Sequence, residues 1–143
     1  MSSDNIGHLY DSIASWWSEQ MESSKYGLDY LDKALRLIEP GSFVLDIGCG
    51  SVFHAPKSQQ RQLIEKMCGL LNNTGVLLFT AGGIDDERSG EMQGVIFHYG
   101  SLKYTDYLDT LDKAGCRMIL MERDQYPEDH MVFLCQKTSY ESQ

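Results

Sequence analysis

The amino-acid sequence predicts an α/β domain, flanked by helices, with a sheet of about four strands that are parallel except for one antiparallel strand in a terminal hairpin. Short apolar runs bounded by turn residues alternate with longer amphipathic segments, which indicates strands linked through helices. Strands connected in this way usually lie parallel in one sheet. The last two apolar runs, residues 117–123 and 130–137, are joined by a short linker that suits an antiparallel hairpin.

Two amphipathic helices are expected in the N-terminal part. Residues 5–20 place apolar side chains at helical spacing, and Asp4 is positioned to cap that helix. Residues 27–38 repeat the pattern, and Pro40 with Gly41 ends it. The apolar face of this second helix consists of Leu28, Leu31, Leu35 and Ile38.

A strand, a helix and a second strand are expected in the middle of the chain. Residues 43–47, FVLDI, form a nearly continuous apolar run that is typical of a strand covered on both faces. Pro56 can open the next helix at its first turn, and NNTG (72–75) stops it. Residues 75–81, GVLLFTA, are expected to form the second buried strand.

The stretch between that strand and the C-terminal hairpin is more polar. Residues 82–94 carry glycines and charges, so we expect a solvated, mobile loop there, followed by an extended segment at 95–99. The acids of this loop lack the spacing of a calcium loop, so no metal is expected. Residues 105–114 predict another amphipathic helix, with Gly115 as its C-terminal cap.

Length and charge indicate one domain and exclude some classes of partner. The chain has 143 residues and a net charge of −9, which argues against a nucleic-acid backbone as partner. Its four cysteines contain no C-x-x-C pair, so zinc is not expected. No apolar run approaches the roughly 20 residues of a membrane span, and the polar N-terminus lacks a signal core. A cytoplasmic protein with no membrane partner is therefore expected.

Residues 44–50, VLDIGCG, resemble the first signature of class I S-adenosylmethionine-dependent methyltransferases of the small-molecule type. In that family a buried strand ends in an acidic residue, and a glycine turn then lets the backbone approach the methionine part of the cofactor. The resemblance implies S-adenosylmethionine as cofactor and assigns its binding to Asp46, Gly48, Cys49 and Gly50. The residues by themselves also allow a turn-capping carboxylate, a plain strand-to-helix turn and an inert thiol.

Three further stretches resemble other parts of this family. They are the lid helix (10–17), the fourth helix with the fifth strand (56–83), and the last helix with the sixth strand (101–124). The resemblance implies one Rossmann-like domain. It is made of an N-terminal helical lid (1–40), a shortened α/β core (41–137) and a tail (138–143).

Candidate substrate-binding residues follow from the same resemblance, which implies no catalytic residue. They are Tyr10, Trp17, Tyr26, His54, Tyr99 and Tyr126. His54 is the histidine of the F-H-x-P segment, which in the family follows the fourth strand, and there it can orient a substrate, act as a base or simply begin a helix. Aromatic residues at helical spacing more often pack in a core, so Tyr10 and Trp17 have that alternative.

The chain also departs from the family, because the glycine turn runs almost directly into Phe53. The block that carries the adenosine-binding half of the family's sheet is absent between them, so the fold is an internally truncated one. A ribose-binding acid is expected ~20 residues after such a turn, and the acid nearest that distance, Glu65, lies in a predicted helix. The expected strand order is 43–48, 75–81, 130–137 and 117–123.

Two functions therefore stay open at this point. The chain is either a minimal methyltransferase of doubtful activity or a non-enzymatic, degenerate fragment that acts as a dimeric module for a small ligand or a protein. A shortened sheet leaves an apolar edge or the neighbouring apolar helices uncovered, and such surfaces favour pairing with another chain. We expect a homodimer, for which a two-fold arrangement is the commonest closed solution.

Overall fold

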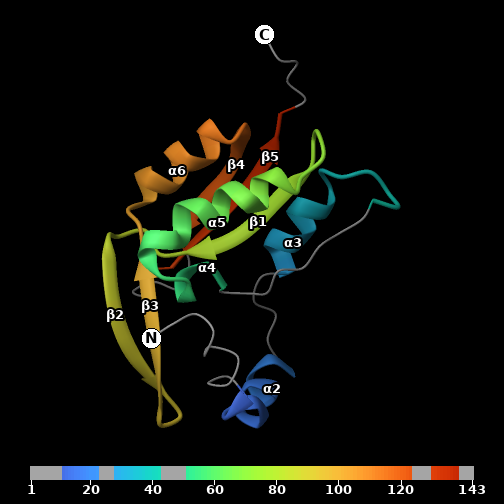
Figure 1. The fold of residues 1–143 in the computed structure, drawn as a ribbon. Coiled ribbons are helices and arrows are strands. Elements are labelled where there is room, and N and C mark those ends of the chain that lie inside the picture. The colour runs from blue at the N-terminus through green and yellow to red at the C-terminus, as the bar shows by residue number, and fades with distance from the viewer. Residues whose placement is uncertain (1–10, 23–27, 43–50, 124–129, 139–143) are drawn as a thin grey trace.

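The computed structural model describes residues 11–22, 28–42, 51–123 and 130–138 of the chain (Figure 1). Its helices are α2 (Ala14–Glu22), α3 (Leu28–Leu35), α4 (Ser51–His54), α5 (Lys57–Gly69) and α6 (Tyr104–Lys113). Its strands are β1 (Val76–Ala81), β2 (Asp86–Met92), β3 (Val95–Ser101), β4 (Cys116–Arg123) and β5 (Met131–Lys137). The expected helices at 56–71 and 105–114 are confirmed as α5 and α6.

The described strands form two sheets, one with the order β1-β5-β4 and one with the order β2-β3. Every described pair is antiparallel. The hairpin of β4 and β5 is therefore confirmed, and so is the place of β5 beside β1. The expectation of a mainly parallel, Rossmann-like sheet is wrong for the described strands.

The position of β5 explains this difference. Both β1 and β4 run antiparallel to β5, so they run parallel to each other without being neighbours. The connection from β1 to β4, which contains the β2–β3 hairpin and α6, does join two strands of the same direction, but β5 separates them in the sheet. The run 43–48, expected as a further strand beside β1, lies outside the described residues.

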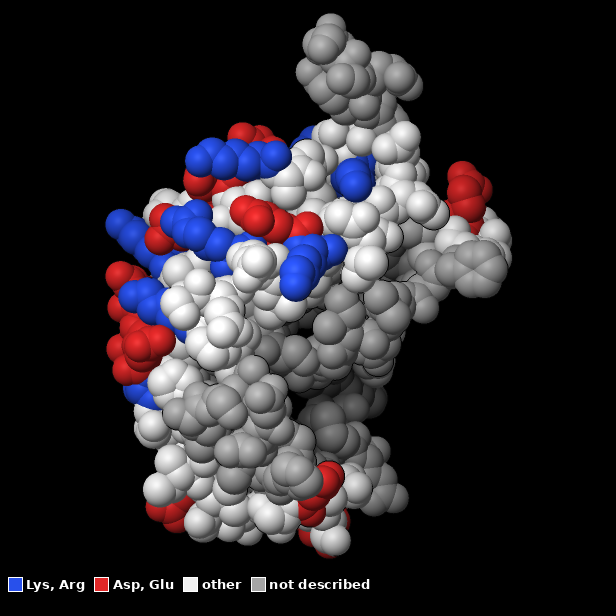
Figure 2. Space-filling model, viewed as in Figure 1, with Lys and Arg blue, Asp and Glu red and all other residues white. Residues whose placement is uncertain are grey.

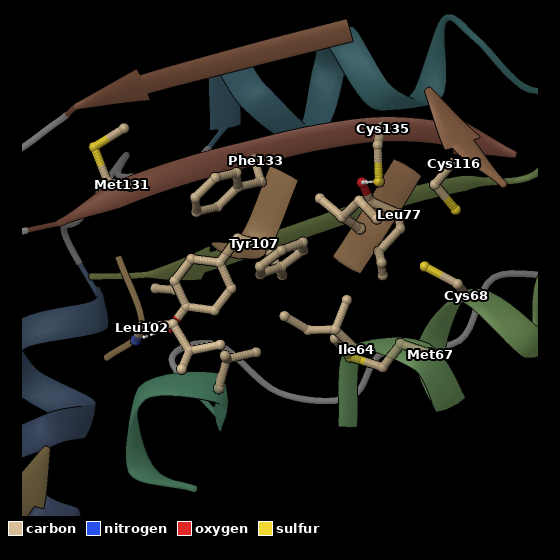
Figure 3. Packing of buried hydrophobic residues seen from close by; sticks show 14 residues of the cluster. Ile64, Met67, Cys68, Leu77, Leu102, Tyr107, Cys116, Met131, Phe133 and Cys135 are labelled. Carbon is tan, nitrogen blue, oxygen red and sulfur yellow. Dashed lines mark hydrogen bonds between the residues drawn. The ribbon is translucent and has the colours of Figure 1, made fainter. Parts of the chain in front are cut away.

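The main hydrophobic core lies between the three-stranded sheet and the helices α4, α5 and α6 (Figure 3). Phe79 of β1 and Phe133 of β5 stack with their ring centroids 4.9 Å apart, and Tyr107 of α6 packs beside Phe133. Ile64 of α5 closes this core and is fully buried. Figure 1 shows α5 and α6 together over this face of the sheet.

A β-bulge in the edge strand β4 adjusts which side chains reach this core. The pairing with β5 shifts between Met118 and Leu120, and Met118 lies opposite Cys135 while Met121 lies opposite Phe133. Both methionines therefore pack against the core although they are three positions apart. A bulge also kinks an edge strand, which discourages pairing with other chains.

Helix α3 packs on the sheet through a different side from the one that the sequence pattern emphasised. Ala34 is buried, and the Tyr30 hydroxyl donates a hydrogen bond of 3.0 Å to Oε2 of Glu122 on β4. Three residues of the expected apolar face are instead exposed to solvent: Leu28, Leu31 and Leu35.

The expected loop at 82–94 is wrong, because most of it forms β2. This strand pairs with β3 from Asp86 opposite Ser101 to Met92 opposite Val95. Gln93 (φ 52°) and Gly94 (φ 78°) form the two-residue turn, both in the left-handed region. This geometry matches the right-handed twist of a hairpin. The hairpin leaves the end of β1 and extends away from the core (Figure 1).

Candidate functional site

Five ring-bearing side chains, from α4, β3 and the residue that precedes β5, meet at the hairpin. We call this set the ring cluster: Phe53, His54, Phe97, Tyr99 and His130. The ring centroids of His54 and Tyr99 are 5.0 Å apart, and those of Phe53 and Tyr99 are 5.7 Å apart. Phe53 also contacts His54 at 4.8 Å and His130 at 6.1 Å. These separations are typical of favourable aromatic contacts.

The local structure of the hairpin explains why these rings meet. Phe97 and Tyr99 alternate along β3 and therefore share one face of the hairpin. On the neighbouring strand, Gly90 lies opposite Phe97 and leaves room for the Tyr99 ring. A Cβ atom at Gly90 would lie only 3.1 Å from Cε2 of Tyr99. Helix α4 supplies Phe53 and His54, and the fifth ring is His130.

His54 is the most enclosed polar member of the ring cluster, with 7% of its surface exposed. Its Nδ1–H donates a hydrogen bond of 3.0 Å to the carbonyl oxygen of His98, which fixes the proton of the neutral ring on Nδ1. Burial lowers the pKa of His54, and the hydrogen bond to the His98 carbonyl opposes that shift in part. The ring is therefore neutral at pH 7.

The other rings differ in how accessible they are. Phe97 is fully buried and forms the base of the cluster, whereas Phe53, Tyr99 and His130 are half-buried. Burial raises the pKa of the Tyr99 phenol, and the positive charge of Arg88 opposes this shift. At neutral pH the cluster thus presents uncharged ring surfaces from Phe53 and Tyr99. Such surfaces suit the face or edge of a flat apolar ligand.

The buried side-chain amide of Gln60 connects the segment after α4 with the end of β3. Gln60 of α5 donates from Nε2 to the carbonyl oxygens of Ala55 (3.0 Å) and Gly100 (2.7 Å). Its Oε1 accepts a hydrogen bond from the Tyr107 hydroxyl, which in turn accepts one from the Leu102 amide at 3.0 Å. The junction of α4 and α5 is therefore tied to the end of β3, and this fixes the distance between His54 and Tyr99.

The structure brings together two of the predicted site residues, His54 and Tyr99. Trp17 lies on α2, and its side chain is outside the description. The other predicted site residues also lie outside the described residues: Tyr10, Tyr26, Asp46, Gly48, Cys49, Gly50 and Tyr126. The expected roles of these residues stay predictions.

Sequence reasoning did not select Phe53 and Phe97 as site residues. Phe53 directly precedes His54 in the F-H-x-P segment, so its position offered a signal. Phe97 and Tyr99 alternate in a short apolar run, which indicates that they share a face if the run is a strand. Neither signal reveals which helix the strand packs against.

The structure describes the surroundings of Glu65 and of two acids at the start of the β2–β3 hairpin. Glu65 is exposed on α5, and Asp85 forms an ion pair with Lys57 at the start of that helix. The Asp86 carboxylate lies 3.8 Å from Nε of Arg88 within β2. Within residues 11–22, 28–42, 51–123 and 130–138, no group of three or more His, Cys, Asp or Glu residues is arranged to hold a metal ion.

A pocket of about 580 Å³ lies at the other end of α6, where that helix meets the start of β4. Leu108, Asp112, Cys116 and Arg117 are among its lining residues, and none of the ring-cluster residues contributes to it. Its lining combines apolar, polar and charged side chains and contains no histidine or tyrosine. The ring cluster, which contains two predicted site residues, is therefore the stronger candidate site.

The surface over α5 and α6 carries charges of both signs (Figure 2). Arg61 contacts Asp106 at 2.9 Å, and Lys113 contacts Asp109 at 3.1 Å. On this face, therefore, basic side chains alternate with acidic ones. None of the described helices is long and apolar enough to cross a membrane.

Comparison with solved structures gives a weak similarity, and the other comparisons give none. No protein-family model matches the chain, and no curated protein matches it. A solved structure with a TM-score of 0.44 is 1,6-didemethyltoxoflavin-N1-methyltransferase from Burkholderia thailandensis, with bound 1,6-didemethyltoxoflavin and S-adenosylhomocysteine. The identity is 16%, and the match covers 65% of this chain and 42% of that one. The chain thus spans less than half of that S-adenosylmethionine-dependent methyltransferase.

Proposed function

We propose that this chain is a methyltransferase-like protein that binds S-adenosylmethionine at residues 46–50 and a small flat molecule at the ring cluster. Methyl transfer by the isolated chain is weak in this proposal, because the sequence lacks the family's adenosine-binding block. The methyl acceptor is a small molecule rather than a nucleic acid, in keeping with the net charge of −9.

The observation that carries the proposal is the meeting of His54 with Tyr99 and Phe53. Phe53 and His54 are the last two residues of α4, and both contact the ring of Tyr99, which comes from β3 much later in the sequence. Ser51, the first residue of α4, directly follows Gly50 of the glycine-turn sequence. The cluster is therefore only a few residues from the motif that resembles a cofactor site.

Methyl transfer needs little direct chemical participation by side chains. S-adenosylmethionine, when bound, supplies an electrophilic methyl group, and correct alignment with the acceptor provides most of the rate enhancement. Phe53 and Tyr99 would hold the acceptor by ring contacts, and Phe97 would exclude water from below. His54 would position these rings through its bond to the His98 carbonyl. No general base is assigned.

The second candidate is a non-enzymatic module that keeps the ring cluster but does not bind the cofactor. The short distance in sequence between Gly50 and Phe53 favours it, because no acid outside a helix lies ~20 residues after the turn. Glu65 is an exposed residue of α5. The two candidates differ in whether S-adenosylhomocysteine binds.

Calorimetric titration with S-adenosylhomocysteine tests the proposal. We expect a dissociation constant in the micromolar range, ~8 kcal/mol of binding free energy, and a loss of at least ten-fold in affinity in Gly50→Val. Gly69→Val is the matched control, because a Cβ at Gly69 would meet no atom within 4 Å. Absence of heat up to millimolar ligand would contradict cofactor binding and favour the second candidate.

Amide chemical shifts locate the ligand when the same titration is followed by NMR. If the ring cluster adjoins the cofactor, S-adenosylhomocysteine should shift the amide signals of Phe53, His54 and Tyr99. The Tyr104 amide at the start of α6 serves as the internal reference, because its exposed ring lies outside the ring cluster. Binding that leaves the cluster signals unchanged would separate the cofactor site from the ring cluster and overturn this part of the proposal.

A further inference from the structure

We propose that the pocket at the C-terminal end of α6 binds a small zwitterion with an apolar tail, namely an α-amino acid with an aliphatic side chain. We call this cavity the α6 pocket, and it shares no lining residue with the ring cluster. The inference therefore does not rest on the proposed function. The lining residues that carry it are Leu108, Leu111, Asp112, Cys116, Arg117 and Thr138.

The α6 pocket has the size and the surroundings of a small-molecule site. Its volume is about 580 Å³, within the ~300–1,000 Å³ that is usual for ligand pockets. It lies where the last turn of α6, the start of β4 and the residue after β5 meet. Leu111 and Cys116 also belong to the hydrophobic core, with 1% and 4% of their surfaces exposed. The pocket is therefore built on packed elements.

Hydrogen bonds at Gly115 fix the rim of the α6 pocket. Gly115 has a φ of 83° and turns the chain from α6 into β4. Its amide donates to the Asp112 carbonyl at 3.0 Å, and its own carbonyl accepts from the Thr138 amide at 3.0 Å and the Thr138 hydroxyl at 3.1 Å. A Cβ atom at Gly115 would meet no atom within 4 Å, so the space beside this turn is open. A fixed rim reduces the entropy that a ligand loses on binding.

The less exposed part of the lining is apolar and aliphatic in character. Leu111 and Cys116 are buried, and Leu108 and Met118 are half-buried. None of the described residues that line the α6 pocket carries an aromatic ring. Contact with an aliphatic tail would remove the remaining apolar surface of Leu108 and Met118 from water, which is favourable. This lining differs from the ring cluster, where ring surfaces suit a flat ligand.

Two features of α6 favour a cationic group on one side of the pocket. Asp112 lines the pocket and is exposed, so its carboxylate is accessible. The carbonyl end of a helix also carries a negative partial charge, and Asp112 lies in the last turn of α6. The neighbouring Lys113 does not neutralise Asp112, because its Nζ lies 3.1 Å from the Asp109 carboxylate. An ammonium group of a ligand therefore has a favourable place here.

Arg117 of β4 favours an anionic group in the same pocket. It is the basic residue of the lining, and its guanidinium can bind a carboxylate through two parallel hydrogen bonds. Among the residues that the structure describes, neither Arg117 nor Asp112 forms an ion pair, with the other or with a third residue. Both charges are thus available to a ligand.

An α-amino acid matches the whole lining. Its ammonium and carboxylate groups are attached to one carbon atom, so a single small molecule can pair with Asp112 and Arg117 together. Its aliphatic side chain can then cover Leu108. A simple amine would leave Arg117 unpaired and a simple carboxylic acid would leave Asp112 unpaired, so either should bind more weakly.

NMR titration of the full chain with L-leucine tests the proposal. We expect the amide signals of Gly115, Cys116 and Thr138 to shift with a dissociation constant of about 1 mM. The signals of Phe53 and Tyr99 in the ring cluster should not move. Two analogues with the same tail each lack one charge: 3-methylbutylamine lacks the carboxylate and 4-methylpentanoate lacks the ammonium. Each should bind about ten-fold more weakly than L-leucine.

Variants that remove one charge assign each partner. Arg117→Gln should weaken L-leucine binding about ten-fold without weakening 3-methylbutylamine, and Asp112→Asn should weaken L-leucine similarly without weakening 4-methylpentanoate. The matched controls are Arg123→Gln at the other end of β4 and Glu65→Gln on α5, both exposed and outside the lining. All four positions are exposed, so circular dichroism should report unchanged folding.

Three results would overturn the proposal. The first is an absence of shifts at Gly115, Cys116 and Thr138 up to about 20 mM L-leucine, which corresponds to negligible binding. The second is equal affinity for L-leucine and its two analogues. The third is a folded Arg117→Gln or Asp112→Asn that binds L-leucine as the wild type does. Because S-adenosylhomocysteine is absent from these titrations, their outcome is separate from that of the proposed function.

Discussion

At the scale of single residues, His54 shows how burial and a backbone contact set the state of a side chain. Its ring is enclosed by Phe53, Phe97 and Tyr99, and its Nδ1–H is used by the His98 carbonyl. Desolvation is the main cause of the lowered pKa, so protonation of His54 destabilises the folded state relative to the unfolded chain. This makes the stability of the protein depend on pH.

The sign of this dependence follows from linkage. The pKa of His54 is lower in the folded chain than the 6.5 of the unfolded chain. The contribution of His54 to the free energy of unfolding is therefore fully present above pH 6.5. The free energy of unfolding should fall as pH decreases below that value, by up to about 1.4 kcal/mol per pH unit. Urea denaturation at half-unit steps between pH 5 and pH 8 measures it.

His54→Asn provides the comparison for this experiment. The asparagine Nδ2–H₂ can still donate to the His98 carbonyl, but it does not titrate. We expect the variant to lose less stability than the wild type between pH 6.5 and pH 5. Parallel curves for the two proteins would show that the His54 pKa is not lowered by folding.

At the scale of elements, the β2–β3 hairpin has an unfavourable residue in its turn. Gln93 adopts a φ of 52°, a conformation that asparagine tolerates much better than glutamine. Gln93→Asn should raise the free energy of unfolding by about 0.5–1 kcal/mol. Gly94→Ala should lower it by about 1 kcal/mol, because Gly94 has a φ of 78°. Urea unfolding of both variants checks these values, and an unchanged or less stable Gln93→Asn would contradict the turn geometry.

The elements that sequence patterns predicted well either have one buried and one solvated face or are continuous apolar runs. Helices α5 and α6 and strands β4 and β5 have such patterns or are continuous apolar runs. Strand β2 was missed because nearly all of its side chains are exposed, so its sequence shows no alternation. The sequence pattern correctly predicted that the leucines of α3 share one side of a helix. Periodicity alone, however, cannot show whether that side packs against another element or faces solvent.

The candidate site was predictable only in part for a related reason. The F-H-x-P segment indicated His54, and the resemblance indicated Tyr99, but their contact depends on how the hairpin packs against α4. That packing uses Phe97 and the space above Gly90, neither of which forms a recognised motif. The direction of neighbouring strands was likewise set by β5, which is the last strand in the sequence.

At the scale of the whole molecule, three buried thiols lie where the strands β4 and β5 pack near helix α5. Cys68, Cys116 and Cys135 are all buried, and Figure 3 shows them at one end of the core. Thiols that are buried in apolar surroundings pack in the core and are not reactive. Burial, with a smaller contribution from the Cys116 thiol, raises the pKa of Cys68 to about 12. Burial also raises the pKa of Cys135.

The shifted thiols predict a loss of stability in alkali. The pKa of Cys68 is raised above the 9.0 of the unfolded chain, so its contribution is complete below pH 9 and is lost as pH rises toward about 12. Each such thiol can lower the free energy of unfolding by up to about 1.4 kcal/mol per pH unit in that range. Lys137, whose Nζ donates to the Cys68 carbonyl at 3.2 Å, opposes the shift only weakly.

Cys68→Ala separates this effect from the titration of lysines and tyrosines. The variant should be less stable at pH 7, because it leaves a cavity beside Met67 and Leu77. Between pH 8.5 and pH 10.5, however, its free energy of unfolding should fall less steeply than that of the wild type. Urea denaturation under reducing conditions measures both slopes. Equal slopes would mean that the Cys68 thiol ionises as readily in the folded core as in the unfolded chain, and the three-thiol end of the core would then have to admit water.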